Sequence, residues 1–208
     1  MPGETMIIFD KVSKSFGEHV LFKDVSFEIK KGEFVVFSGV SGCGKTTMLN
    51  MIGGLEKLSG GTILVDNVDV SKRQNQLEYF RNKVGFLFQT FALIENKTVF
   101  QNLDMIKTDC RSEITIEDAM AKVGLSDKLN AKIYTLSGGE QQRVALARLM
   151  VKKCDLILAD EPTGSLDKGN ASAVIDILKE MNTNQGKTVI MVTHDDELKK
   201  QGNRIINL

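Results

Sequence analysis

The sequence GVSGCGKTT, residues 39–47, stands between an apolar run and a helix-like pattern. The run before it is EFVVFS (33–38), and the pattern that overlaps its end is TMLNMI (47–52). A strand, a glycine-rich loop and a helix in this order match the spacing G-x-x-x-x-G-K-[ST] in the context that this pattern requires. The glycines let backbone N–H groups turn toward one point, and the helix start adds unpaired donors and a positive dipole end.

This stretch predicts a phosphate-binding loop for a nucleoside triphosphate. Lys45 is expected to bridge the β- and γ-phosphates, and the Thr46 hydroxyl to ligate Mg²⁺. The alternative, a tight glycine turn beside a surface lysine, is disfavoured because spacing and context agree. The residues expected to surround the phosphates are Gly39, Val40, Ser41, Gly42, Cys43, Gly44, Lys45, Thr46 and Thr47.

The composition is that of an ordinary soluble globular protein. The 208 residues are 42% hydrophobic and 26% charged, with 27 basic and 27 acidic residues, so the net charge is zero. A zero net charge argues against a nucleic-acid binder. No apolar run approaches the ~18 residues of a membrane span, and we expect no direct membrane insertion. The three cysteines are scattered, which favours free thiols in the cytosol over a disulfide framework.

The order of elements predicts an α/β fold. Short apolar strands are expected at 6–9, 25–29 and 33–38, and later strands at 62–65, 84–88, 155–160, 187–193 and 204–208. Helices are expected at 74–83, 138–152 and 168–182. Strands alternating with helices imply a largely parallel core sheet. Residues 96–135 carry only weak helical stretches (98–107, 115–123 and 126–131), so we expect a helical subdomain inserted between core segments 1–95 and 136–208.

Two carboxylates follow the apolar strand LILAD (156–160). Ligands bind at the carboxyl ends of strands in open α/β sheets, so Asp160 is expected to hold Mg²⁺ and Glu161 to accept a proton from an attacking water. Pro162 biases Glu161 toward an extended backbone. An acidic loop without chemistry is the alternative.

Gln89 and His194 each end a further apolar strand. Glutamine can orient water or ligate a metal, and a neutral imidazole can contact a γ-phosphate or water. On local grounds a solvated strand end is the default for Gln89, and a loop histidine that caps or is solvated is an equal alternative for His194.

The sequence LSGGE (136–140) opens the next helix. Ser137 and Glu140 form a capping box, which explains those two residues without any ligand. Gly138 and Gly139 are not explained by it, because each glycine weakens a helix by roughly 1 kcal/mol relative to alanine. They make sense if backbone N–H groups approach an anion closely, so a second anion-binding helix start is predicted.

Together these motifs resemble the nucleotide-binding subunit of ABC transporters over essentially the whole chain. The motifs occur in the order that the family has. They are the phosphate loop, Gln89 at the start of the glutamine loop, LSGGE followed by QQRVALAR, LILAD with Glu161, the segment 165–167 as the D-loop, and His194 as the switch histidine. The resemblance implies the ABC ATPase fold: a P-loop NTPase core, an antiparallel β subdomain and the helical subdomain.

The resemblance also implies a head-to-tail dimer that binds ATP and Mg²⁺. ATP would lie between the phosphate loop of one copy and the LSGGE helix of the other, and Asp167 is a further implied nucleotide-binding residue, with Ser137, Gly138, Gly139 and Glu140. Phe16 falls where the family places an aromatic ring against adenine; a core phenylalanine at a strand end is the alternative. Glu161, His194 and Gln89 are the implied catalytic residues, and Thr46, Gln89 and Asp160 the implied metal ligands.

The segment FQTFALIENKTVFQNL (88–103) is similar to the group that includes lipoprotein-releasing, macrolide-efflux and cell-division ATPases. ALIENKTV most resembles bacteriocin exporters of Gram-positive bacteria. The implied partner is a membrane permease, with the ATPase peripheral on the cytoplasmic face. An ATPase that drives a permease-like partner to regulate cell-wall enzymes shares every motif and stays open. A kinase would not need LSGGE, and a DNA-repair ATPase would carry a long coiled coil.

Overall fold

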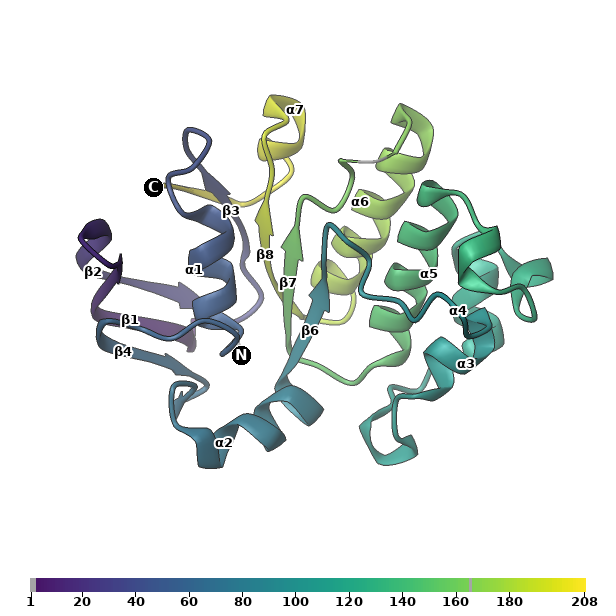
Figure 1. Cartoon of the computed structure of the whole chain (residues 1–208), viewed down its shortest axis with the longest axis horizontal. Helices are drawn as coiled ribbons and strands as arrows, with labels where there is room; N and C mark the ends of the chain where they lie inside the picture. The colour runs from purple at the N-terminus through teal and green to yellow at the C-terminus, as the bar shows by residue number, and fades with distance from the viewer. Residues whose placement is uncertain (1–2, 165) are drawn as a thin grey trace.

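A computed structural model describes residues 3–164 and 166–208. It contains two sheets with helices between and beside them (Figure 1). The antiparallel sheet has the order β2-β1-β4-β5, made of β1 (Thr5–Phe16), β2 (His19–Lys30), β4 (Gly60–Val65) and β5 (Val68–Asp69). The parallel sheet has the order β6-β7-β8-β3-β9, made of β3 (Phe34–Ser38), β6 (Val84–Leu87), β7 (Leu156–Asp160), β8 (Thr188–Val192) and β9 (Arg204–Asn207). The α/β prediction with a parallel core sheet and an antiparallel subdomain is confirmed.

The central strands are buried on both faces, which is why they are almost wholly apolar. In β3, Val35 and Phe37 pack with α1 (Lys45–Ile52) and the antiparallel sheet, while Phe34 and Val36 join the core on the opposite side. That opposite core contains α5 (Gly138–Val151) and α6 (Lys168–Thr183). Alternate residues of one strand therefore belong to two cores, as the two-residue period of a strand requires.

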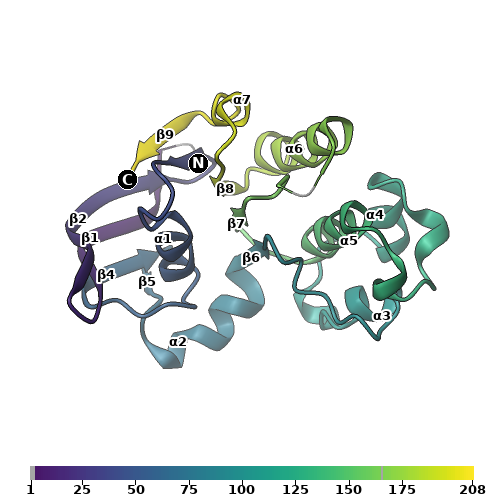
Figure 2. The ribbon, with the colours of Figure 1, turned by 45° about the horizontal axis from the view of Figure 1, so that its top comes forward.

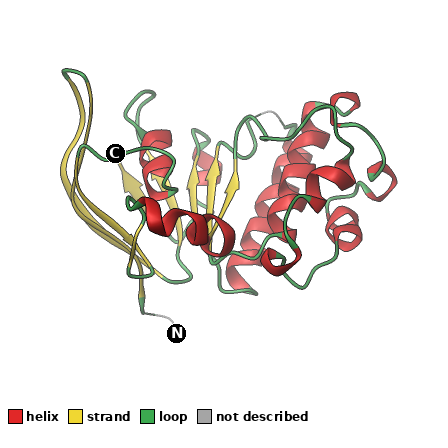
Figure 3. Cartoon of the chain, turned by 60° about the horizontal axis from the view of Figure 1, so that its bottom comes forward, coloured by secondary structure: helices red, strands yellow, loops and turns green. Residues whose placement is uncertain are grey.

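The helical segment lies at the far side of α5 from the parallel sheet, as Figure 2 shows. It contains α3 (Val99–Asp104), α4 (Ile116–Lys122) and the 3-10 turns η2 (Thr108–Cys110), η3 (Ser126–Lys128) and η4 (Ile133–Thr135). Figure 3 separates this helical region from the strands by colour. The expected helix 126–131 is wrong, since only one 3-10 turn forms there, and the helix expected at 98–107 is limited to six residues.

Other element boundaries also differ from the sequence expectation. β1 and β2 are each 12 residues long because β-bulges, such as that between Phe9 and Val12, let the ladder continue past polar positions. The expected helix 74–83 divides into α2 (Arg73–Glu78) and a π-helical turn η1 (Tyr79–Lys83). The short helix α7 (Asp196–Lys199) follows β8. Within the described residues, no helix is both long enough and apolar enough to cross a membrane.

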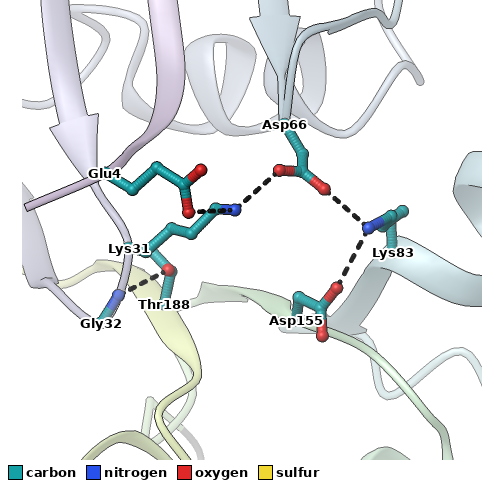
Figure 4. Close-up of polar contacts among 7 residues, drawn as sticks. All are labelled: Glu4, Lys31, Gly32, Asp66, Lys83, Asp155 and Thr188. Carbon is teal, nitrogen blue, oxygen red and sulfur yellow. Dashed lines mark hydrogen bonds and ion pairs between the residues drawn. The ribbon is translucent and has the colours of Figure 1, made fainter. Parts of the chain in front are cut away.

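A chain of ion pairs joins the two sheets at the end opposite the phosphate loop (Figure 4). Lys31 contacts Glu4 and Asp66, each at 2.9 Å, and Lys83 contacts Asp66 at 2.7 Å and Asp155 at 3.3 Å. Asp66 thus lies between two ammonium groups, and its hydrogen bonds from Lys83 and Lys31 lower the pKa of its carboxyl. These contacts connect the turn after β4 with η1 and with the segment before β7.

Replacing Asp66 by asparagine is expected to lower the free energy of unfolding by about 1 kcal/mol at pH 7, since the carboxylate is partly exposed and screened by solvent. A lowered carboxyl pKa stabilises the fold above the unfolded value of about 3.9 and loses that effect as the pH falls. Urea titrations of both proteins should therefore differ at pH 7 and differ less at pH 3. Asp127→Asn, at a carboxylate 76% exposed, is the control. An equal difference at both pH values would contradict this account.

Candidate nucleotide site

The loop between β3 and α1 has the conformation that its glycines permit. Gly39, Gly42 and Gly44 have φ angles of 153°, 82° and 99°. A Cβ at Gly44 would lie 2.5 Å from Phe22 Cζ and 2.7 Å from Leu21 Cδ2, so β2 packs directly against the loop at this point. Any other residue at position 44 would be strained at a φ angle of 99° and would displace the side chains of Leu21 and Phe22.

Lys45 is buried at the start of α1, and its ammonium group points back into the loop. Nζ donates hydrogen bonds to the carbonyl oxygens of Gly39 at 3.0 Å and Val40 at 2.9 Å. These are neutral acceptors, and a triphosphate offers charged ones, which make stronger hydrogen bonds to an ammonium group.

The end of β7 lies beside the start of α1. The Thr46 hydroxyl donates to Asp160 Oδ1 at 3.1 Å, although the two residues are 114 positions apart in the chain. Burial raises the pKa of the Asp160 carboxyl. A hydroxyl and a carboxylate are both oxygen donors, the type that Mg²⁺ prefers.

Glu161 follows directly and faces His194 from the end of β8. Oε1 of Glu161 lies 3.3 Å from Nε2 of His194, yet it is buried and has no hydrogen-bond partner within the described residues. Burial raises the pKa of this carboxyl, which makes its ionised form a stronger base. A water molecule or another donor would satisfy the free oxygen.

The backbone at Glu161 corrects one expectation. We expected an extended conformation before Pro162, but the φ angle of Glu161 is +45°, in the left-handed region that residues other than glycine rarely adopt. One tertiary contact and one local turn hold it there: Glu161 N donates to Val192 O at 3.0 Å, and Gly164 N donates to Glu161 O at 3.2 Å. Such strain costs on the order of 1–3 kcal/mol and persists only where surrounding contacts determine it.

These residues border one cleft of about 640 Å³, a volume within the usual range for small-molecule sites. Expected site residues that line it are Phe16, Ser41, Gly42, Gly44, Lys45, Thr46, Thr47, Gln89, Glu161 and His194. His19, Leu21, Gly164 and Val192 line it as well and were not expected from the sequence. The structure therefore brings the phosphate loop together with the ends of β1, β6, β7 and β8. Gly39, Val40 and Cys43 belong to the loop but do not line the cleft. Asp160 does not line it either, but it accepts a hydrogen bond from Thr46, which does.

The LSGGE segment lies outside this cleft. Its capping box is present, with Ser137 Oγ accepting from Glu140 N at 3.3 Å and Glu140 Oε2 accepting from Ser137 N at 2.8 Å. The hydrogen bond from Ser137 N lowers the pKa of the Glu140 carboxyl. Ser137 and Gly138 are exposed, so the start of α5 presents free backbone donors to the surroundings. Gly139 is half-buried, and a Cβ there would lie 3.2 Å from Leu166 Cδ2.

Asp167, the last residue of the expected D-loop segment, forms the N-terminal cap of α6. Its Oδ1 accepts from the backbone N–H groups of Gly169 and Asn170 at 3.0 and 3.1 Å. Asp167 does not line the cleft, and Ser165 lies outside the described residues.

Two side chains of α5 support the site in a way that the sequence reasoning missed. Gln142, 1% exposed, donates to Pro162 O at 2.8 Å, and Arg148 donates to the carbonyl oxygens of Phe91 and Ala92 after Gln89. The sequence did indicate that Gln142 is buried, because it lies three and four positions before the apolar residues Ala145 and Leu146, on the same face of the helix. A polar residue in an apolar helical stripe indicates a buried hydrogen bond.

The residues present fit ATP with Mg²⁺. The cleft has the necessary size, the loop offers backbone N–H groups at a helix start, and the free Glu161 oxygen lies where a water could donate to it. No group of three or more His, Cys, Asp and Glu side chains that could hold a metal occurs in the part of the chain that the structure describes. The hydroxyl of Thr46 and the carboxylate of Asp160 are oxygen donors of the kind that Mg²⁺ takes, one or two from the protein together with phosphate oxygens and water.

Comparison with known proteins agrees with this geometry. Residues 22–164 match the family model described as ABC transporter. The chain belongs to the ABC transporter family. At the level of this domain, the expected ABC-type ATPase is confirmed.

The chain is 39% identical over 210 residues to the macrolide export ATP-binding/permease protein MacB of Campylobacter jejuni, an alignment that covers 98% of this chain and 33% of MacB. The chain thus spans about a third of that relative. It is 37% identical to the uncharacterized ABC transporter ATP-binding protein YvrO of Bacillus subtilis, covering 97% of this chain and 92% of YvrO. The macrolide-export relative confirms the expected group; the resemblance to bacteriocin exporters stays a prediction.

A solved structure with the same fold is that of the ATP-binding cassette MJ0796, dimeric, in a post-hydrolysis state and bound to ADP and Pi. Its TM-score to this chain is 0.86 at 36% identity, and the alignment covers 98% of this chain and 94% of that one. The expected ABC ATPase fold is therefore confirmed.

Replacing Gln142 by leucine is expected to lower the free energy of unfolding by about 1–3 kcal/mol, because the buried Pro162 carbonyl loses its donor. Urea unfolding monitored by circular dichroism measures this. The matched control is Gln201→Leu, whose amide donates to Glu197 O on the surface and should change stability by less than about 0.5 kcal/mol. Equal effects of the two substitutions would contradict the assigned role of Gln142.

Proposed function

We propose that the chain is the ATP-hydrolysing subunit of an ABC transporter and that two copies close head-to-tail on ATP to drive a membrane permease. One observation carries the proposal: the chain has two helix starts suited to anions, and only one lines the cleft. The start of α1 borders the cleft, while the exposed start of α5 does not. A second copy offers the simplest way to bring an α5 start to the nucleotide.

In the proposed closed state, the two helix starts hold the triphosphate from opposite sides. The loop N–H groups and Lys45 bind the phosphates of one copy's nucleotide, and Ser137 with the backbone of Gly138 and Gly139 contributes from the other copy. Mg²⁺, held by Thr46 and Asp160 with Gln89 nearby, would neutralise charge on the phosphate oxygens. Asp167 caps α6 next to this interface.

Hydrolysis then depends on Glu161 and His194. The free Oε1 of Glu161 accepts a proton from the water that attacks the γ-phosphorus, and His194, 3.3 Å away, orients the same water. The bond from the γ-phosphorus to the bridging oxygen breaks, which leaves ADP and phosphate. Because ATP has different affinities for the open and closed states, its binding and loss can drive a partner.

We further propose that the permease partner exports a peptide, lipid or antimicrobial, with the ATPase peripheral on the inner face of the membrane. The 39% identity to a protein named for macrolide export supports an export role. Co-purification of the chain with its membrane partner, and identification of that partner's extracytoplasmic domain, tests this. A partner that binds cell-wall hydrolases instead of releasing cargo would favour the regulatory alternative.

Glu161→Gln is expected to lower ATP turnover at least about 100-fold while the dissociation constant for ATP changes less than about 3-fold, because the amide cannot accept the water proton. Phosphate release and equilibrium nucleotide binding measure the two quantities. Glu180→Gln, which removes an exposed pair with Lys122, is the control and should turn over normally. Normal turnover by Glu161→Gln would show that Glu161 is not the base.

Ser137→Arg is expected to abolish hydrolysis without weakening ATP binding by the same chain, since a bulky cation at the α5 start prevents closure of the dimer. The comparison substitution is Ser126→Arg, at another exposed serine of the helical segment, which should leave turnover unchanged. If the Ser137→Arg chain lost ATP binding, LSGGE would act within its own chain and not across the dimer.

A further inference from the structure

The ring of Phe16 has a buried ammonium group on one face. Nζ of Lys14 lies 4.2 Å from the centroid of the ring, and Lys14 is only 7% exposed. The same Nζ lies 2.7 Å from Glu56 Oε1. Phe16 itself is 49% exposed and borders the nucleotide cleft. One side of the ring is therefore held by a cation, and the rest of it is available to a ligand.

The strand end that carries Phe16 is tied to the loop that follows α1. Glu56 lies in that loop, and its hydrogen bond from Lys14 lowers the pKa of the Glu56 carboxyl. A second tie is the hydrogen bond from Ser15 N to Ser59 Oγ, 3.0 Å long. Both contacts connect the end of β1 with the chain segment that follows the phosphate-loop helix, so the strand end that carries the ring is anchored to that segment.

Burying a lysine beside an aromatic ring needs a reason, since a desolvated ammonium group is costly unless it is paired. Glu56 provides the pair, and the ring provides a second favourable partner. An aromatic face carries partial negative charge, and a cation on one face draws that density toward itself. The face of the Phe16 ring turned away from Lys14 then carries less negative charge, so it repels the π-electrons of a stacked base less strongly. Phenylalanine has no hydroxyl that could anchor its outer end, so the ammonium group is also what fixes the ring.

We propose that Lys14 and Glu56 are positioning residues for nucleobase binding: they hold and polarise Phe16 so that its free face stacks on the purine base. This inference rests on the proposed function, because it requires a nucleoside triphosphate in the cleft. It adds that affinity for the base, and not for the phosphates, depends on an ion pair outside the cleft lining, between the buried Lys14 and the partly exposed Glu56.

The test separates the base from the phosphates. Lys14→Met keeps most of the length of the side chain and an apolar stem, but removes the charge. It should weaken ATP binding about 3- to 10-fold in isothermal titration, while binding of inorganic tripolyphosphate, which has no base, stays unchanged. Lys14→Arg should restore ATP affinity, since guanidinium also stacks on aromatic rings. In a Phe16→Ala background, Lys14→Met should have no further effect on ATP binding.

The matched control is Lys31→Met, which removes a similarly paired lysine at the far end of the sheets and should change neither affinity. Equal weakening of ATP and tripolyphosphate by Lys14→Met would overturn the proposal, because the pair would then only support the fold of the loop. Unchanged binding of both ligands would overturn it as well. Failure of the unmodified chain to bind ATP would instead refute the proposed function itself.

Discussion

Parallel pairing of β6, β7, β8 and β3 is the constraint on which the site depends. Parallel strands end at the same edge of a sheet, so the residues after each strand must lie close together however far apart they are in sequence. The phosphate loop follows β3, Asp160 and Glu161 end or follow β7, and His194 follows β8. The hydrogen bond between Thr46 and Asp160 is the direct product of this arrangement.

The strongest sequence signals were those in which residue type and context agreed. The central strands are apolar on both faces, so β3, β7 and β8 were predicted within one or two residues. The capping box at Ser137 was also predictable, because it needs only two residues three positions apart. The residue pattern was less informative at the hairpin of β1 and β2, where bulges extend the ladder through polar positions, and at 126–131, where only a single 3-10 turn forms.

The remaining features of the site could not be predicted because they arise from contacts between distant segments. The left-handed backbone of Glu161 opposes the local preference before proline and is held by β8. The pairing of Gln142 with Pro162, and of Lys14 with Glu56 and Phe16, depends on which strands and helices pack together. In each case a polar residue was visible in the sequence, but its partner became apparent only in the folded chain.

The central claim is that the chain carries half of each nucleotide site and that a second copy completes it. The most direct measurement is the mass of the Glu161→Gln chain in solution, by light scattering, with and without ATP and Mg²⁺. This account predicts a change from the monomer mass of 23.0 kDa to twice that value on adding ATP, and no change when Ser137→Arg is introduced as well. A Glu161→Gln chain that stays monomeric while saturated with ATP would contradict the claim.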